Sequence, residues 1–132
     1  LYGLDILCEN FQDKDGNTTR FMILSTEKQV PEFVTGNRYI TTIMFTVRNI
    51  PAALYKALGG FATNGVNMVK LESYMASDTM TATSFHLDVE GHPDQKAMKH
   101  AMQELEFFAK DLRVMGTYEA HPFRYQDDII VE

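Results

Sequence analysis

The chain has 132 residues, of which 45% are hydrophobic and 23% are charged, so we expect one domain with a sizeable core and a short appendage. Its net charge of -6 argues against a nucleic acid partner, because phosphate backbones bind clustered lysines and arginines. The single cysteine excludes an internal disulfide and favours a reducing compartment, and no apolar run has the length of a membrane span. We therefore expect a cytoplasmic protein with no membrane partner.

The first part of the chain shows only weak periodicity. Apolar residues in 1–9 lie broadly on one side of a helix, which predicts the end of a longer helix. After a stretch of turn-forming residues, the apolar run at 20–24 has the length of a strand. Pro31 and Gly36 interrupt any period within 25–38, so this part is expected to be a linker with little regular structure.

Regular structure is expected to start at residue 39. Apolar and polar residues alternate over 39–47, as in a strand with one face on a core. Pro51 suits the first turn of a helix, and Gly65 after Asn64 suits the left-handed residue that ends one. The helix between them has an apolar stripe at three- and four-residue spacing, formed by Leu54, Ala57, Leu58 and Phe61.

Two further strands are expected at 66–75 and 81–90, separated by a turn. In the second of them Phe85, Leu87 and Val89 share one face. The opposite face, with His86, Asp88 and Glu90, is expected to be exposed to solvent.

A second helix is expected to open at 91–93 and to end at 110–111, before a last strand at 112–118. The order of elements is then βαββαβ, the order of the α+β ferredoxin-like fold. Residues 124–132 show no period and are expected to form a tail.

Three short motifs lie in the first helix and the strand that follows it: AALYKAL at 52–58, GVN at 65–67 and ESYM at 72–75. In order and spacing they resemble the motifs of ACT domains, the ligand-sensing modules of amino-acid metabolism, in the form carried by prephenate dehydratases. Two positions depart from that pattern, because the family's leading Gly is Ala52 and its closing Arg-Pro is Tyr74-Met75.

A fourth motif, Asn17-Thr18-Thr19-Arg20-Phe21, resembles the N-x-T-R-F motif of the prephenate dehydratase catalytic domain. Its place about thirty residues ahead of the ACT-like pattern makes a chance match improbable. The resemblance implies that the full-length protein is a lyase that converts prephenate to phenylpyruvate with loss of carbon dioxide and water. It implies that Thr19 is the catalytic hydroxyl and that Asn17, Arg20 and Phe21 bind substrate.

The resemblance divides the chain into 1–24, a helix-strand remnant of an α/β catalytic domain; 25–38, a linker; 39–123, a complete ACT regulatory domain; and 124–132, a tail. Most of the catalytic domain is expected to lie outside this sequence, so the 132-residue chain alone is expected to be inactive on prephenate.

The resemblance also implies an amino-acid effector, most simply phenylalanine, bound between two ACT protomers. The expected contacts are Ala52, Ala53, Leu54, Asn67 and Met68. A homodimer or higher homo-oligomer is expected, because the edges of a four-stranded sheet readily pair with another chain.

No cofactor or metal site is expected. The four histidines have no ligand spacing, and no Gly-rich phosphate loop follows a strand. Two alternatives remain open from the sequence, namely a non-catalytic module that binds an amino acid and a dimerisation module without a ligand.

Overall fold

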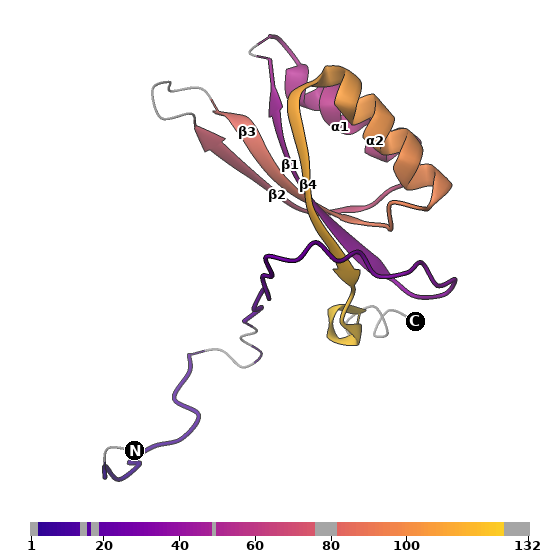
Figure 1. Ribbon diagram of the computed structural model, residues 1–132. Coiled ribbons are helices and arrows are strands. Elements are labelled where there is room, and N and C mark those ends of the chain that lie inside the picture. The colour runs from indigo at the N-terminus through magenta and orange to yellow at the C-terminus, as the bar shows by residue number, and fades with distance from the viewer. Residues whose placement is uncertain (1–2, 14–15, 17–18, 49, 76–81, 126–132) are drawn as a thin grey trace, which may run out of the picture.

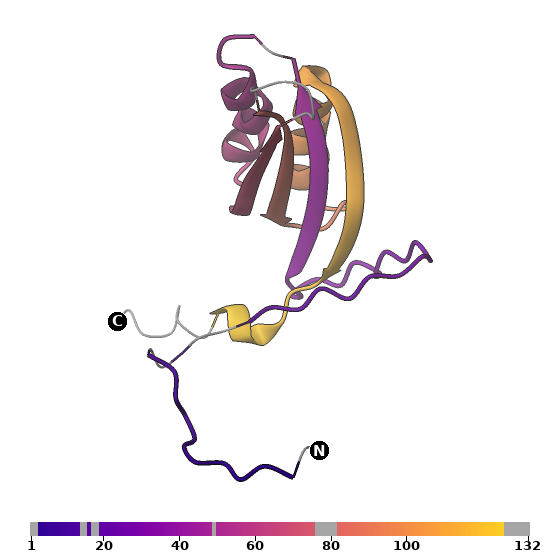
Figure 2. The ribbon, with the colours of Figure 1, turned by 90° about the vertical axis from the view of Figure 1, so that its left-hand side faces the viewer.

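The computed structural model describes residues 3–13, 16, 19–48, 50–75 and 82–125. In chain order the elements are β1 (Tyr39–Val47), α1 (Ala53–Thr63), β2 (Met68–Met75), β3 (Ala82–Glu90), α2 (Lys96–Phe108), β4 (Ala109–Glu119) and a short 3-10 turn, η1 (Pro122–Tyr125). The strands form one antiparallel sheet in the order β2-β3-β1-β4. Both helices cover the same face of this sheet (Figures 1 and 2). The predicted ferredoxin-like order is confirmed.

The core lies between the sheet and the two helices. β1 occupies an inner position in the sheet and supplies Ile43, Phe45 and Val47, each at most 5% exposed, as its alternation predicted. The helices add their own buried side chains, which include Ala57, Phe61, Met98, Ala101 and Leu105. Local periodicity was therefore sufficient to identify the face that β1 and α1 bury.

The two helices approach each other closely at Gly60. A Cβ atom built on Gly60 would lie 2.6 Å from the Cβ of Glu104 on α2. The neighbouring Gly59 has no atom within 4 Å of its own hypothetical Cβ. Gly60 is therefore required by the helix contact, whereas Gly59 is not.

The helix expected over residues 1–9 and the strand expected over 20–24 are not formed. The described residues 3–13 and 19–24 are exposed and have neither helical nor strand structure, and Leu7 and Ile23 are each 97% exposed. A short helix is marginal without a surface to pack on, and a strand needs a neighbour to pair with. The described part of the chain supplies neither to these residues, so local pattern alone did not decide their structure.

Residues 25–38 have no helix or strand, as predicted, but the last part of this segment is fixed to the sheet and its adjoining loop. The hydroxyl of Tyr39 donates to the carbonyl of Glu32 at 3.0 Å and accepts from the amide of Val34 at 2.9 Å. The buried ring of His92 adds a hydrogen bond of 2.9 Å between its Nε2 and the carbonyl of Pro31. Because Nδ1 of that ring accepts from the amide of Asp94, Nε2 is the donor to this carbonyl.

The expectation that the outer face of β3 is exposed is wrong at Asp88, which is 0% exposed. Thr42 on β1 donates to one of its oxygens at 2.7 Å, and Arg20 lies 3.2 Å from the other. The partner from the N-terminal segment is far away in sequence, so the alternation within β3 could not reveal it.

Candidate functional site

A cavity of about 510 Å3 lies where α1 begins. It is bounded by the end of β1, the turn into α1, the first residues of the helix, and side chains of β2 and β3. The lining residues are Val47, Arg48, Ile50, Ala52, Ala53, Leu54, Tyr55, Leu71, Ser73 and Phe85. Three of the five predicted effector contacts, Ala52 to Leu54, are among them.

The backbone at the start of α1 is suited to hold an anion. Ala52 precedes the helix with φ 59° and ψ 19°, and no side chain caps the helix. The amide of Ala53 is bonded to the carbonyl of Ile50, and that of Lys56 to the carbonyl of Ala52. The amides of Leu54 and Tyr55 lie between these two, in the first turn, where they have no intrahelical acceptor. This end of a helix dipole favours negative charge.

The left-handed conformation of Ala52 explains why the family pattern has Gly at this place. Gly adopts a φ near +60° without a steric penalty, whereas a residue with a Cβ is strained there. Ala52 therefore keeps the helix start of the pattern at some cost in backbone energy.

The side chains of the cavity combine apolar walls with the polar groups of Arg48, Ser73 and Tyr55. Leu71 and Phe85 supply apolar surface from the sheet, and Arg48 supplies a positive charge. Ser73 contributes a hydroxyl. The described lining residues include no His, Asp, Glu or Cys, so the arrangement fits binding of a small molecule with an acidic and an apolar part.

β2 divides its side chains between the cavity and the opposite face. Ser73 lines the cavity, while its neighbours Glu72 and Tyr74 are hydrogen-bonded to each other at 2.9 Å. Hydrogen bonds from Lys70 and then Tyr74 hold the pKa of Glu72 below its ordinary value, and the bond to Glu72 raises the pKa of Tyr74. Tyr74, which departs from the family motif, therefore does not line this cavity. The cation that lines the cavity is Arg48.

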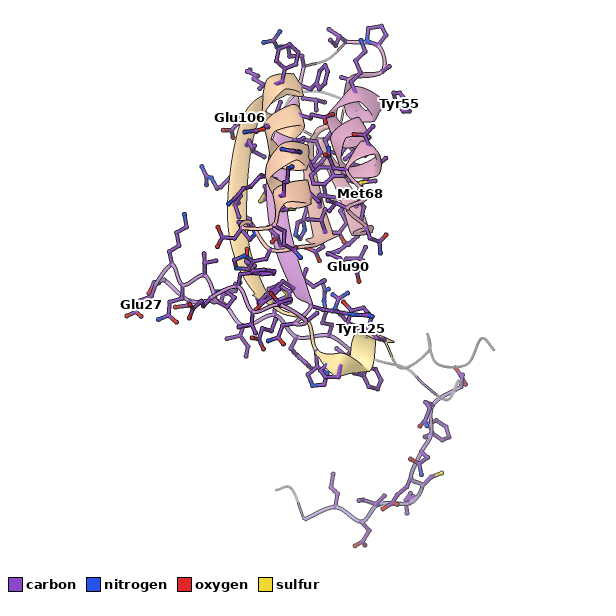
Figure 3. The ribbon with its side chains drawn as sticks, turned by 90° about the vertical axis from the view of Figure 1, so that its right-hand side faces the viewer. Glu27, Tyr55, Met68, Glu90, Glu106 and Tyr125 are labelled. Carbon is purple, nitrogen blue, oxygen red and sulfur yellow. The ribbon has the colours of Figure 1, made fainter. Side chains whose placement is uncertain are left out.

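The remaining predicted effector contacts, Asn67 and Met68, do not line the cavity. Tyr55 lies at one end of α1 and Met68 toward the other (Figure 3). The amide nitrogen of the Asn67 side chain donates to Glu90 at 3.0 Å, and the backbone amide of Glu90 donates to the Asn67 carbonyl at 2.8 Å. Within one protomer Asn67 therefore joins the end of α1 to β3.

The predicted substrate motif is only partly described, since Asn17 lies outside the described residues. Thr19 and Phe21 are exposed, Phe21 at 85%, and Arg20 is paired with Asp88. None of these three lines the cavity.

Sequence reasoning missed the contributions of Arg48, Leu71 and Phe85 to the cavity. Ser73 stood inside a recognised motif and could have been included. Leu71 and Phe85 come to the site through strand pairing, for which a single sequence gives no direct signal. Arg48 directly follows β1 and lies only a few residues before the first motif.

Among the described residues no group of three or more His, Cys, Asp or Glu side chains could hold a metal ion. In the same part of the chain, no helix is both long enough and apolar enough for a bilayer crossing.

Comparison with known proteins gives the family relationship. No protein-family model matches the chain. The bifunctional N-acyl-homoserine lactone acylase/prephenate dehydratase of Komagataeibacter europaeus is 49% identical over 125 residues, which cover 94% of this chain and 44% of that protein. The bifunctional chorismate mutase/prephenate dehydratase of Aquifex aeolicus is 37% identical over 117 residues, covering 89% of this chain and 31% of that protein. The chain is a relative of the prephenate dehydratases.

Solved structures agree with this relationship. The prephenate dehydratase of Arthrobacter aurescens in complex with L-Phe matches with a TM-score of 0.61 and 27% identity, over 71% of this chain and 30% of that one. A structure described as GqqA, a novel type of quorum quenching acylase, matches with a TM-score of 0.67 and 48% identity, over 74% of this chain and 35% of that one. The chain thus spans less than half the length of the prephenate dehydratases described here.

Proposed function

We propose that this chain is part of a prephenate dehydratase and that residues 39–123 are its regulatory ACT domain. The observation that carries the proposal is the cavity at the start of α1, which coincides with the first ACT-like motif. In this assignment 1–24 belong to the catalytic domain, 25–38 are the linker and 124–132 the tail. The exposed free thiol of Cys8 suits a reducing cytoplasm.

The ligand of this cavity is proposed to be phenylalanine. Its carboxylate would accept from the amides of Leu54 and Tyr55 and pair with Arg48, since charge-assisted hydrogen bonds favour such an anion. Its ring would pack against Leu71 and Phe85. A related structure is described as a complex with L-Phe, which supports this choice of ligand.

Calorimetric titration of the chain with phenylalanine, tyrosine and tryptophan tests the ligand assignment. We expect phenylalanine to bind and Arg48→Gln to weaken binding about 10-fold or more, the usual effect of losing a charged hydrogen bond. Arg113→Gln is the matched control, because Arg113 is exposed on β4 and does not line the cavity. The sensor function would be rejected if none of the three amino acids binds, or if the chain prefers a charged amino acid.

The complete effector site is proposed to lie between two copies of the chain. Asn67 and Met68 would then contribute from the second protomer. β2 and β4 are the edge strands, and an edge strand can pair with another chain. Sedimentation at micromolar concentration should show at least a dimer, and a monomer at all concentrations would contradict this arrangement.

The catalytic role is proposed for the longer protein. Prephenate would lose carbon dioxide and its ring hydroxyl, which leaves as water once protonated, and phenylpyruvate would form. Thr19 would act in the proton transfer, and Arg20 would bind a substrate carboxylate with Phe21 beside it.

Conversion of prephenate to phenylpyruvate tests the catalytic assignment. We expect the 132-residue chain to be inactive and the longer protein to be active. In the longer protein Thr19→Ala should lower kcat by roughly 100-fold or more. An unchanged kcat would mean that Thr19 does not act in the reaction.

A second candidate activity comes from a relative that is 49% identical and named also as an N-acyl-homoserine lactone acylase. Release of homoserine lactone from an acylated substrate by the longer protein would support it. If the chain binds an amino acid and the longer protein has neither activity, the chain is a binding module. If it only dimerises, it is a dimerisation module.

A further inference from the structure

Asp88 is a fully buried carboxylate on the face of the sheet that carries no helix. Its side chain is 0% exposed, and its Oδ1 accepts a hydrogen bond of 2.7 Å from Thr42. Its Oδ2 lies 3.2 Å from Nη2 of Arg20. A buried carboxyl group is costly without polar partners, and the guanidinium of Arg20 is one of the two groups that supply them.

The partner comes from an N-terminal segment whose described residues up to 24 are exposed. Residues 3–13 and 21–24 are exposed, whereas Arg20 reaches a residue 68 positions further along the chain. Figures 1 and 2 show this N-terminal segment approaching the end of the sheet at which β1 begins. The side chain of Arg20 remains 39% exposed, so a molecule from solvent can still reach the guanidinium.

Other titratable side chains lie on the same face: Lys70, which is opposite Asp88 in β2, is paired with Glu72 at 3.1 Å. Nε2 of His86 is 3.5 Å from Oδ1 of Asp88 but is buried without a hydrogen bond, and its Nδ1 is 3.4 Å from Glu72. The close partners of Asp88 are therefore Arg20 and Thr42.

β3 connects Asp88 with the cavity at the start of α1. Phe85 lines that cavity and Asp88 lies three positions further along the same strand. Phe85 faces the helices and Asp88 the opposite side, so one strand contacts the proposed effector on one face and Arg20 on the other.

We propose that Asp88 is a positioning residue that holds Arg20 for the substrate and makes that position sensitive to the effector cavity. This inference rests on the proposed function. A carboxylate bonded to one nitrogen of a guanidinium restrains the position of that side chain and leaves its other donors for a second anion. A shift of β3 on effector binding would move Asp88 and Arg20 together.

A double-mutant cycle in the longer protein tests the role of Asp88. We expect Asp88→Asn to lower kcat/KM for prephenate about 10-fold, mainly through KM, because Arg20 loses its orientation. In an Arg20→Gln background the same change should lower it no further. Asp111→Asn, an exposed carboxylate on β4, is the matched control and should leave kcat/KM unchanged.

Inhibition by phenylalanine gives a second readout. Asp88→Asn should weaken inhibition while calorimetry shows unchanged phenylalanine binding. The positioning role is overturned if Asp88→Asn lowers kcat/KM equally in the parent protein and in the Arg20→Gln variant. It is also overturned if phenylalanine inhibits the Asp88→Asn variant as strongly as it inhibits the parent protein. Failure of the parent protein to convert prephenate instead refutes the proposed function. In that case, the stability of the 132-residue chain still tests the contact between Arg20 and Asp88. The free energy of unfolding would be measured for Arg20→Gln, for Asp88→Asn and for the double variant. If the two effects simply add, the two side chains do not interact.

Discussion

Replacing Gly60 by alanine tests how closely α1 and α2 must pack. The added methyl group would lie 2.6 Å from the Cβ of Glu104, an atom next to the backbone that cannot rotate away. The helices must therefore separate or distort, and inserting one carbon into a packed contact typically costs about 1–3 kcal/mol. Alanine also favours a helix over glycine by about 1 kcal/mol, which offsets part of this cost.

Gly59→Ala provides the control, since no atom lies within 4 Å of its added methyl group. The gain in helix propensity is common to both variants, so their difference isolates the steric cost. In urea unfolding followed by circular dichroism, we expect Gly60→Ala to be about 1–3 kcal/mol less stable than Gly59→Ala.

A Glu104→Gly change would remove the obstructing Cβ and should reduce that difference. Equal stability of the two alanine variants would refute the close contact. Since α1 also forms one wall of the cavity, Gly60→Ala should weaken effector binding as well.

Three further predictions concern single sites. Ala52→Gly should change the free energy of unfolding by less than about 1 kcal/mol, because relief of left-handed strain opposes the larger entropy of glycine in the unfolded chain. Calorimetry should show tighter phenylalanine binding, because the backbone can approach the carboxylate more closely. Tyr39→Phe should cost about 1 kcal/mol, because the backbone groups of Glu32 and Val34 lose their partner at a partly buried site, and limited proteolysis should cut residues 25–38 faster. In an NMR titration the carboxyl of Glu72 should titrate below its ordinary value of 4.5, with Lys70→Met moving the midpoint back toward it. Because this pKa is lowered by folding, the stabilisation from the bonds of Glu72 to Lys70 and Tyr74 is present above pH 4.5 and is lost as the pH falls through the folded pKa.

The elements of the domain could be predicted because their sequence patterns agree with their tertiary contacts. β1 runs over Tyr39–Val47, as its alternation indicated, and Gly65 has the positive φ of 68° expected after a helix. The start of α1 differs, since the first helical residue is Ala53 rather than Pro51. The left-handed Ala52 explains this difference, and alanine gives no local signal for that conformation.

Structure that depends on distant partners could not be read from local pattern. The apolar residues of 1–9 and 20–24 have helical and strand character, yet the described ones stay exposed because nothing in the described chain packs on them. The prediction for Asp88 is wrong in the opposite direction, because its place in an alternating strand indicated exposure to solvent, whereas the side chain is buried. Arg20 contacts Asp88 there, and the pattern of β3 does not contain this partner.

Only some of the residues in the ACT-like motifs line the candidate effector site. Ala52 to Leu54 line the cavity because they are consecutive at the start of one helix. Asn67 belongs to the same pattern but follows the other end of an 11-residue helix, about 16 Å away at 1.5 Å per residue. A single amino acid cannot touch both ends of that helix in one protomer. The motif can therefore act on one ligand only if two protomers bring opposite ends of α1 together, and otherwise Asn67 serves only to join α1 to β3 through Glu90.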